Sequence, residues 1–138
     1  MNNPAPPPVR AAIGCLVASA VATAVLAALQ LAGLIPSPGT GFTLFVGGLT
    51  IALLVLVATQ IGARRNWARW LFLVIYVLGS GVFVLNLLVA PRSILAQPIL
   101  LRTSGVLQAI LQTVALVAMF TGTSKGWFSS KDAAQRAL

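Results

Sequence analysis

Five uncharged polar residues within long apolar stretches could bind a ligand: Gln30, Tyr76, Asn86, Gln108 and Gln112. Gln108 and Gln112 are four residues apart, so on a helix their side chains share one face. Amide and phenol groups donate and accept hydrogen bonds without a charge, which suits a neutral ligand better than an ion. We expect the four amides to form a polar pocket that opens outward, with Tyr76 nearer the middle. Hydrogen bonding between helices, worth about 0.6 kcal/mol per bond, is the alternative explanation.

The residue types that most enzymes need are missing from these apolar stretches. The chain has 138 residues, of which nine are Lys or Arg, one is acidic and none is His. Cys15 is the single cysteine, and Asp132, the single acid, lies near the C-terminus. The sequence therefore excludes a disulfide within the chain, a His- or Cys-based metal site and a pair of catalytic carboxylates. We expect no cofactor, no metal and no enzymatic activity.

The composition is that of a membrane protein, with 59% hydrophobic and 7% charged residues. A soluble domain carries about 25% charged residues. Four apolar stretches, each close to the length of about 20 residues that spans a bilayer, occupy residues 11–35, 42–63, 67–90 and 98–121. Short links between them predict an all-α, polytopic bundle of four transmembrane helices, arranged as two antiparallel hairpins. The bundle covers residues 11–128, after a flexible Pro-rich lead-in at 1–10 and before a short cytoplasmic tail at 129–138.

The link at residues 90–102 has two interpretations, because it is apolar but interrupted by two prolines and two arginines. It could lie along the lipid headgroups as an interfacial segment. Alternatively, Gln97 caps a helix whose first residue is Pro98, a position that proline favours. Arg102 would then lie one turn inside the helix and extend outward. We favour the second interpretation.

The basic residues are divided unequally between the two sides of such a bundle. One side carries seven of them: Arg10, Arg64, Arg65, Arg69, Lys125, Lys131 and Arg136. The other carries Arg92 and Arg102. Because the more basic side faces the cytoplasm, both termini are predicted to be cytoplasmic. All three tryptophans fall at the same boundary, as interfacial aromatic residues do.

One basic and aromatic string joins the second and third stretches, and it contains Arg64, Arg65, Asn66, Trp67, Arg69 and Trp70. It could bind anionic lipid headgroups or an acidic loop of a partner; an ordinary cytoplasmic turn is the alternative. The pattern Arg-x-Asn-Trp-Ala-Arg, with a later Ser-x-x-Trp-Phe at residues 124–128, resembles a broad set of small four-span bacterial inner-membrane proteins. The resemblance implies a multi-pass protein of the bacterial inner membrane, and it provides no catalytic residues.

Small residues follow one another at helical spacing in the first stretch, at Gly14, Ala18 and Ala22. Such a face lets another helix approach closely, whether from this chain, a second copy or another subunit. We therefore expect a non-enzymatic accessory or interaction subunit, in a homo-oligomer or a larger membrane complex. A small transporter or channel for a neutral or lipophilic cargo is the alternative, and an immunity protein against a membrane-acting toxin is a weaker one. Membrane lipids, including anionic headgroups, are expected partners, whereas nucleic acid is not, because the charges are divided among separate loops.

Overall fold

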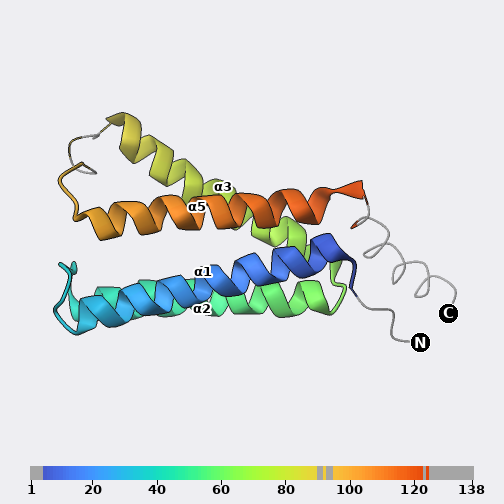
Figure 1. Ribbon diagram of the computed structural model, residues 1–138, viewed down its shortest axis with the longest axis horizontal. Coiled ribbons are helices and arrows are strands. Elements are labelled where there is room, and N and C mark those ends of the chain that lie inside the picture. Colours follow the sequence, from blue (N-terminus) through green and yellow to red (C-terminus); the bar gives the residue numbers. More distant parts are fainter. Residues whose placement is uncertain (1–4, 90–91, 93–94, 123, 125–138) are drawn as a thin grey trace, which may run out of the picture.

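The computed structural model describes residues 5–89, 92, 95–122 and 124, and it contains four long α-helices (Figure 1). These are α1 (Pro7–Leu31), α2 (Thr40–Gly62), α3 (Asn66–Val89) and α5 (Ile99–Phe120). The prediction of an all-helical chain with a helix in each apolar stretch is therefore confirmed. By length and composition, α1, α2 and α5 are long and apolar enough to cross a membrane.

The helix ends differ from the predicted ones by a few residues, most of all in α1. This helix begins at Pro7 rather than at residue 11. Proline is tolerated in the first turn of a helix, because a backbone N–H at that position would have no partner within the helix. It ends at Leu31, and Gly33 then adopts a φ of 71° that stops the helix. At the 90–102 link, Pro98 is the N-cap of α5 and Ile99 its first residue, one position later than expected.

Helix α1 packs along both α2 and α5, whereas α3 contacts α2 and α5 over a shorter stretch. Neighbouring helices run in opposite directions. In the pair α1–α2, Ala27 lies near Gly47 while Ile13 lies near Gly62. In the pair α3–α5, the ring of Trp70 meets that of Phe120, and the Tyr76 hydroxyl meets that of Thr113.

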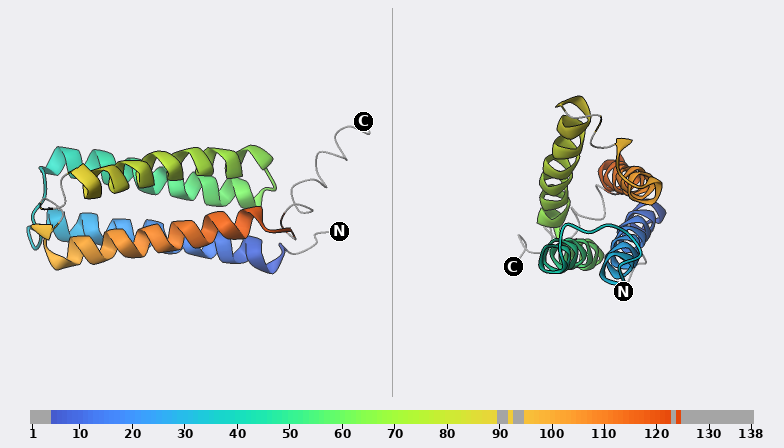
Figure 2. Two further views of the ribbon diagram at one scale, coloured as in Figure 1. Left: turned by 90° about the horizontal axis from the view of Figure 1, so that it is seen from above. Right: turned by 90° about the vertical axis from the view of Figure 1, so that its left-hand side faces the viewer.

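The tightly packed core lies at one end of the bundle. Its buried residues come mainly from the first halves of α1 and α3 and the second halves of α2 and α5: Val9, Ala12, Leu16, Ala20, Leu54, Val57, Ala58, Ile61, Ala68, Phe72, Ala115 and Met119. Toward the other end α3 diverges from α5, as two views of the ribbon show (Figures 1 and 2). The bundle is thus closed at the end where α1 begins and looser at the end where α1 stops.

The turn between α2 and α3 places a non-glycine residue in the left-handed region. Arg64 has a φ of 60°, its N–H donates to the carbonyl of Ile61, and the N–H of Arg65 donates to that of Gln60. These two bonds form a Schellman motif at the C-terminal end of α2, in which the residue in the left-handed conformation is usually glycine. The end of α1 has the same pair of bonds around Gly33.

We expect Arg64→Gly to raise the free energy of unfolding by about 1 kcal/mol, because it removes the steric cost of the left-handed conformation. Equilibrium unfolding in mixed detergent micelles measures the change. Arg65→Gly is the matched control: it removes the same charge one position later without relieving a positive φ. An equal gain from both variants would assign the effect to charge rather than to backbone strain.

Candidate ligand pocket

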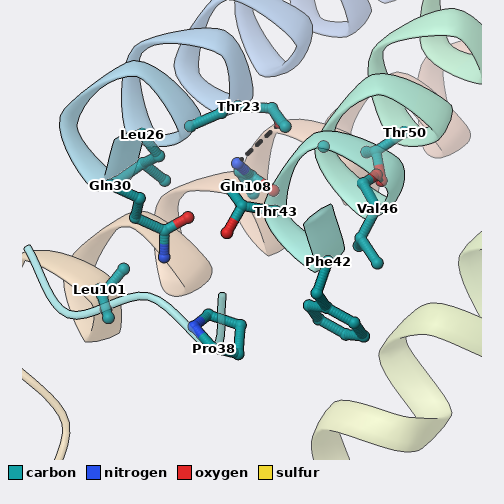
Figure 3. Close-up of a pocket in the computed structure, with 12 residues that line it drawn as sticks. Thr23, Leu26, Gln30, Pro38, Phe42, Thr43, Val46, Thr50, Leu101 and Gln108 are labelled. Carbon is teal, nitrogen blue, oxygen red and sulfur yellow. Dashed lines mark hydrogen bonds between the residues drawn. The ribbon is translucent and has the colours of Figure 1, made fainter. Parts of the chain in front are cut away.

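A pocket of about 310 Å³ lies at the looser end of the bundle, between the last turns of α1, the first turns of α2 and the first half of α5 (Figure 3). Its wall is largely apolar, with Leu26, Pro38, Phe42, Val46 and Leu101 among the lining residues. The polar side chains that line it are Thr23, Gln30, Thr43, Thr50 and Gln108. None of these groups carries a charge, so the pocket suits hydrogen bonding to a neutral molecule rather than acid–base chemistry.

Gln108 connects α5 to α1 across the pocket. Its Nε2 donates a hydrogen bond of 3.1 Å to Oγ1 of Thr23, and Thr23 in turn donates to the Ser19 carbonyl at 2.9 Å. Because the Thr23 hydroxyl proton is donated within its own helix, Thr23 must accept the hydrogen bond from Gln108. The amino group of the Gln108 amide, rather than its oxygen, therefore faces α1.

Gln30 holds its amide at the edge of the same pocket. Its Nε2 donates to the carbonyl of Pro36 in the α1–α2 connection, at 3.4 Å. This distance is beyond the usual 2.7–3.2 Å for such a bond, so the contact is weak. The Gln30 amide is therefore available to a ligand at a small energetic cost.

Thr43 is the buried polar residue of this region, with 5% of its surface exposed. Its hydroxyl oxygen is buried and has no hydrogen-bond partner among the described residues. Other threonines in the helices, such as Thr23, Thr50 and Thr113, donate to the carbonyl four residues earlier. A buried hydroxyl without a partner costs about 1–3 kcal/mol, and a ligand in the pocket could remove that cost.

Of the five polar residues predicted to bind a ligand, the structure brings Gln30 and Gln108 together. Gln112 lines a separate cavity of about 70 Å³ instead, with Phe72 of α3 as a neighbour. The Tyr76 hydroxyl is 2.7 Å from Oγ1 of Thr113. Asn86 belongs to α3, but its side chain lies outside the part that the structure describes.

Sequence reasoning missed Thr23 and Thr43 as pocket residues. Thr23 precedes Gln30 by seven residues, which places both on one face of α1, so its spacing was a usable signal. Thr43 had no such signal, because threonine is common in apolar helices and usually bonds its own backbone.

The basic and aromatic string lies at the opposite end of the bundle, where α2 ends and α3 begins. Trp70 meets Phe120 edge to face, with ring centroids 5.5 Å apart. The Arg69 guanidinium lies 5.5 Å from the Phe120 ring and 6.0 Å from the Trp70 ring. Arg65, Trp67 and Trp70 are exposed, whereas Arg64, Asn66 and Arg69 are half-buried. Arg69 and Trp70 thus help to hold α3 against α5, and Arg65 and Trp67 are left for lipid or a partner.

The small residues of α1 lie mostly away from the helices of this chain. Gly14 and Ala18 are exposed and Ala22 is half-buried. The face that α1 buries runs instead through Ala12, Leu16 and Ser19. Close packing at Gly14 and Ala18 therefore requires a helix from outside the described bundle.

No protein-family model, curated protein or solved structure matches the chain. Within the described residues, no group of His, Cys, Asp or Glu could hold a metal ion. The uncharged pocket, with its amides and unpartnered hydroxyl, is therefore the feature from which we infer function.

Proposed function

We propose that the protein is a four-span protein of the bacterial inner membrane that binds a small neutral molecule in this pocket, as a transporter or channel for a neutral or lipophilic cargo. The observation that carries the proposal is the convergence of Gln30, Gln108 and the unpartnered Thr43 hydroxyl on one pocket. No catalytic step is proposed.

The proposed topology has two antiparallel hairpins with both termini in the cytoplasm. Arg10, Arg64, Arg65 and Arg69 gather at the end of the bundle where α1 and α3 begin, and the positive-inside rule puts this end in the cytoplasm. The pocket lies at the other end, so in this topology it opens toward the periplasmic side. The apolar core lies between the pocket and the cytoplasm.

The expected ligand has an apolar body and one or two uncharged hydrogen-bonding groups. The pocket volume of about 310 Å³ is near the lower end of the range of about 300–1,000 Å³ that is typical of ligand pockets. A charged ligand would be disfavoured, because the lining offers no opposite charge to offset its desolvation.

Transport, rather than binding alone, is supported by a second cavity. Thr50 lines the main pocket and also the cavity that Gln112 lines, so the two spaces share one lining residue. The smaller cavity also reaches Val57 and Phe72, which belong to the core. Passage to the cytoplasmic side would require this core to open.

Binding can be tested with the full chain in lipid nanodiscs, using N-benzylacetamide as a neutral probe and benzoate and benzylamine as ionic counterparts. Saturation-transfer NMR should show saturable binding of the amide and none of the ions, relative to empty nanodiscs. Equal signals from all three probes would contradict a neutral pocket. Uptake of the amide by proteoliposomes, above the rate for protein-free vesicles, would support transport.

Thr43→Val is expected to affect stability and binding in opposite directions. Removing the unpartnered hydroxyl should raise the free energy of unfolding by about 1 kcal/mol, and it should weaken N-benzylacetamide binding about five- to tenfold by removing a polar contact. Ser19→Ala is the matched control, because Ser19 also has a buried, unpartnered hydroxyl but does not line the pocket. It should raise stability without changing affinity; a stronger affinity in Thr43→Val would contradict the assignment.

A role as an accessory subunit is the second candidate, and the exposure of Gly14 and Ala18 favours it. The partner helix would come from a second copy or from a larger membrane complex. Purification of the tagged chain in mild detergent, followed by mass determination of the intact complex, tests this role. A stoichiometric partner lost in Ala18→Leu would support it, whereas a chain that is always monomeric would count against it.

A further inference from the structure

A second polar feature lies on the outside of the bundle, around Arg102 in the first turns of α5. Arg102 lines an open groove of about 470 Å³ together with Ile99, Thr103, Val106, Leu107 and Ile110. Those described lining residues all belong to one face of α5. The ribbons of α3 and α5 separate toward this end of the bundle (Figures 1 and 2).

The charge of Arg102 has no acidic counterpart in the described part of the chain. The sequence holds one acidic residue, Asp132, which follows α5 and belongs, in the proposed topology, to the cytoplasmic side. Arg102 is half-buried, and its Nε is buried without a hydrogen-bond partner among the described residues. A charged guanidinium next to lipid is costly unless an anion or water accompanies it, and an anion would have to come from outside the described part of the chain.

We propose that this groove binds an anionic phospholipid, with its phosphate at Arg102 and part of an acyl chain along Val106 and Ile110. The guanidinium donates hydrogen bonds to phosphate oxygens in a geometry that arginine favours. The exposed apolar side chains of Val106, Leu107 and Ile110 continue the groove toward the middle of the helix. From Arg102 to Ile110 the helix rises about 12 Å at 1.5 Å per residue, which gives an acyl chain a long apolar contact.

Charge and shape together identify a lipid rather than a free anion. A free phosphate would use Arg102 but not the apolar stripe below it, and the described residues of a second copy would bring no carboxylate. This site is separate from the proposed pocket for neutral ligands, since none of the described residues lines both.

Photo-crosslinking in nanodiscs tests the proposal. The probes are phosphatidylglycerol with a diazirine in its acyl chain and phosphatidylcholine with the same chain. Peptide mapping should show that residues 99–110 label about five- to tenfold more with phosphatidylglycerol, the effect expected of one arginine near anionic lipid. The exposed face of α2 near Val55 and Leu56 serves as a reference, at which both lipids should label equally.

Arg102→Gln should abolish this preference, and Arg102→Lys should retain most of it. Arg92→Gln is the matched control, because Arg92 is exposed, precedes α5 and does not line the groove. Equal labelling by both lipids in the native chain would overturn the proposal, as would an equal loss in Arg92→Gln. Competition by millimolar inorganic phosphate would assign the site to a free anion, and replacement of lipid labelling by a crosslinked dimer would assign it to a second copy; either result rejects the lipid.

Discussion

Replacing Gln108 with Leu is expected to weaken binding of N-benzylacetamide at least tenfold. The substitution removes the amide that crosses the pocket from α5 and leaves Thr23 without its donor. On the ligand, the loss of the hydrogen bond to Gln108 and a polar group left without a partner together cost about 1.5–3 kcal/mol, which corresponds to a change in Kd of about 10- to 100-fold. The free energy of unfolding should fall by less than about 1 kcal/mol, because single hydrogen bonds between membrane helices contribute little.

Gln112→Leu is the control for this prediction, because it makes the same chemical change one turn further along α5. Gln112 lines the smaller cavity and not the main pocket, so its replacement should change the Kd of the probe by less than twofold. Both variants should be compared in the same nanodiscs. If Gln112→Leu weakened binding and Gln108→Leu did not, the binding site would be the smaller cavity.

Gln108 and Gln112 line different cavities, although their spacing in the sequence predicted a shared pocket. Two residues four apart differ by about 40° around a helix, so they share a face only approximately. Helix α5 packs against α1 on one side and contacts α3 on another. With that small angle between them, Gln108 bonds to Thr23 of α1, whereas Gln112 lines a cavity formed with residues of α2 and α3. The directions depend on how α5 is rotated in the bundle, which spacing within one helix does not determine.

The helices themselves could be predicted because strong breakers separate them. The stretch from Pro36 to Gly41 contains prolines and glycines that keep α1 and α2 apart, and the polar residues Arg64 to Asn66 separate α2 from α3. The asymmetry between the closed and the looser end could not be predicted in the same way. The core depends on which side chains meet across helices, such as Leu16, Phe72 and Met119, and no pattern within one stretch determines that.

Phe72→Ala is expected to be the most destabilising single substitution in α3. Phe72 is 1% exposed and belongs to the core, and it also lines the cavity beside Thr50 and Val57 of α2. Truncation of a buried phenylalanine costs about 3–5 kcal/mol, because apolar contacts are lost and a void remains. Val77→Ala is the control on the same helix, since Val77 is exposed, and it should change stability by less than about 0.5 kcal/mol.

The effect of Phe72→Ala on binding tests whether α3 is needed to form the main pocket. The described lining of the main pocket comes from α1, α2, α5 and the α1–α2 connection, and none of it from α3. Loosening of α3 by Phe72→Ala should therefore lower the midpoint of unfolding while the Kd for N-benzylacetamide, measured below that midpoint, changes by less than about threefold. Loss of binding in parallel with stability would mean that α3 is required to form the pocket. Retention of binding would identify α1, α2 and α5 as the binding unit and leave α3, which is attached to them mainly at the closed end, as the helix that can move.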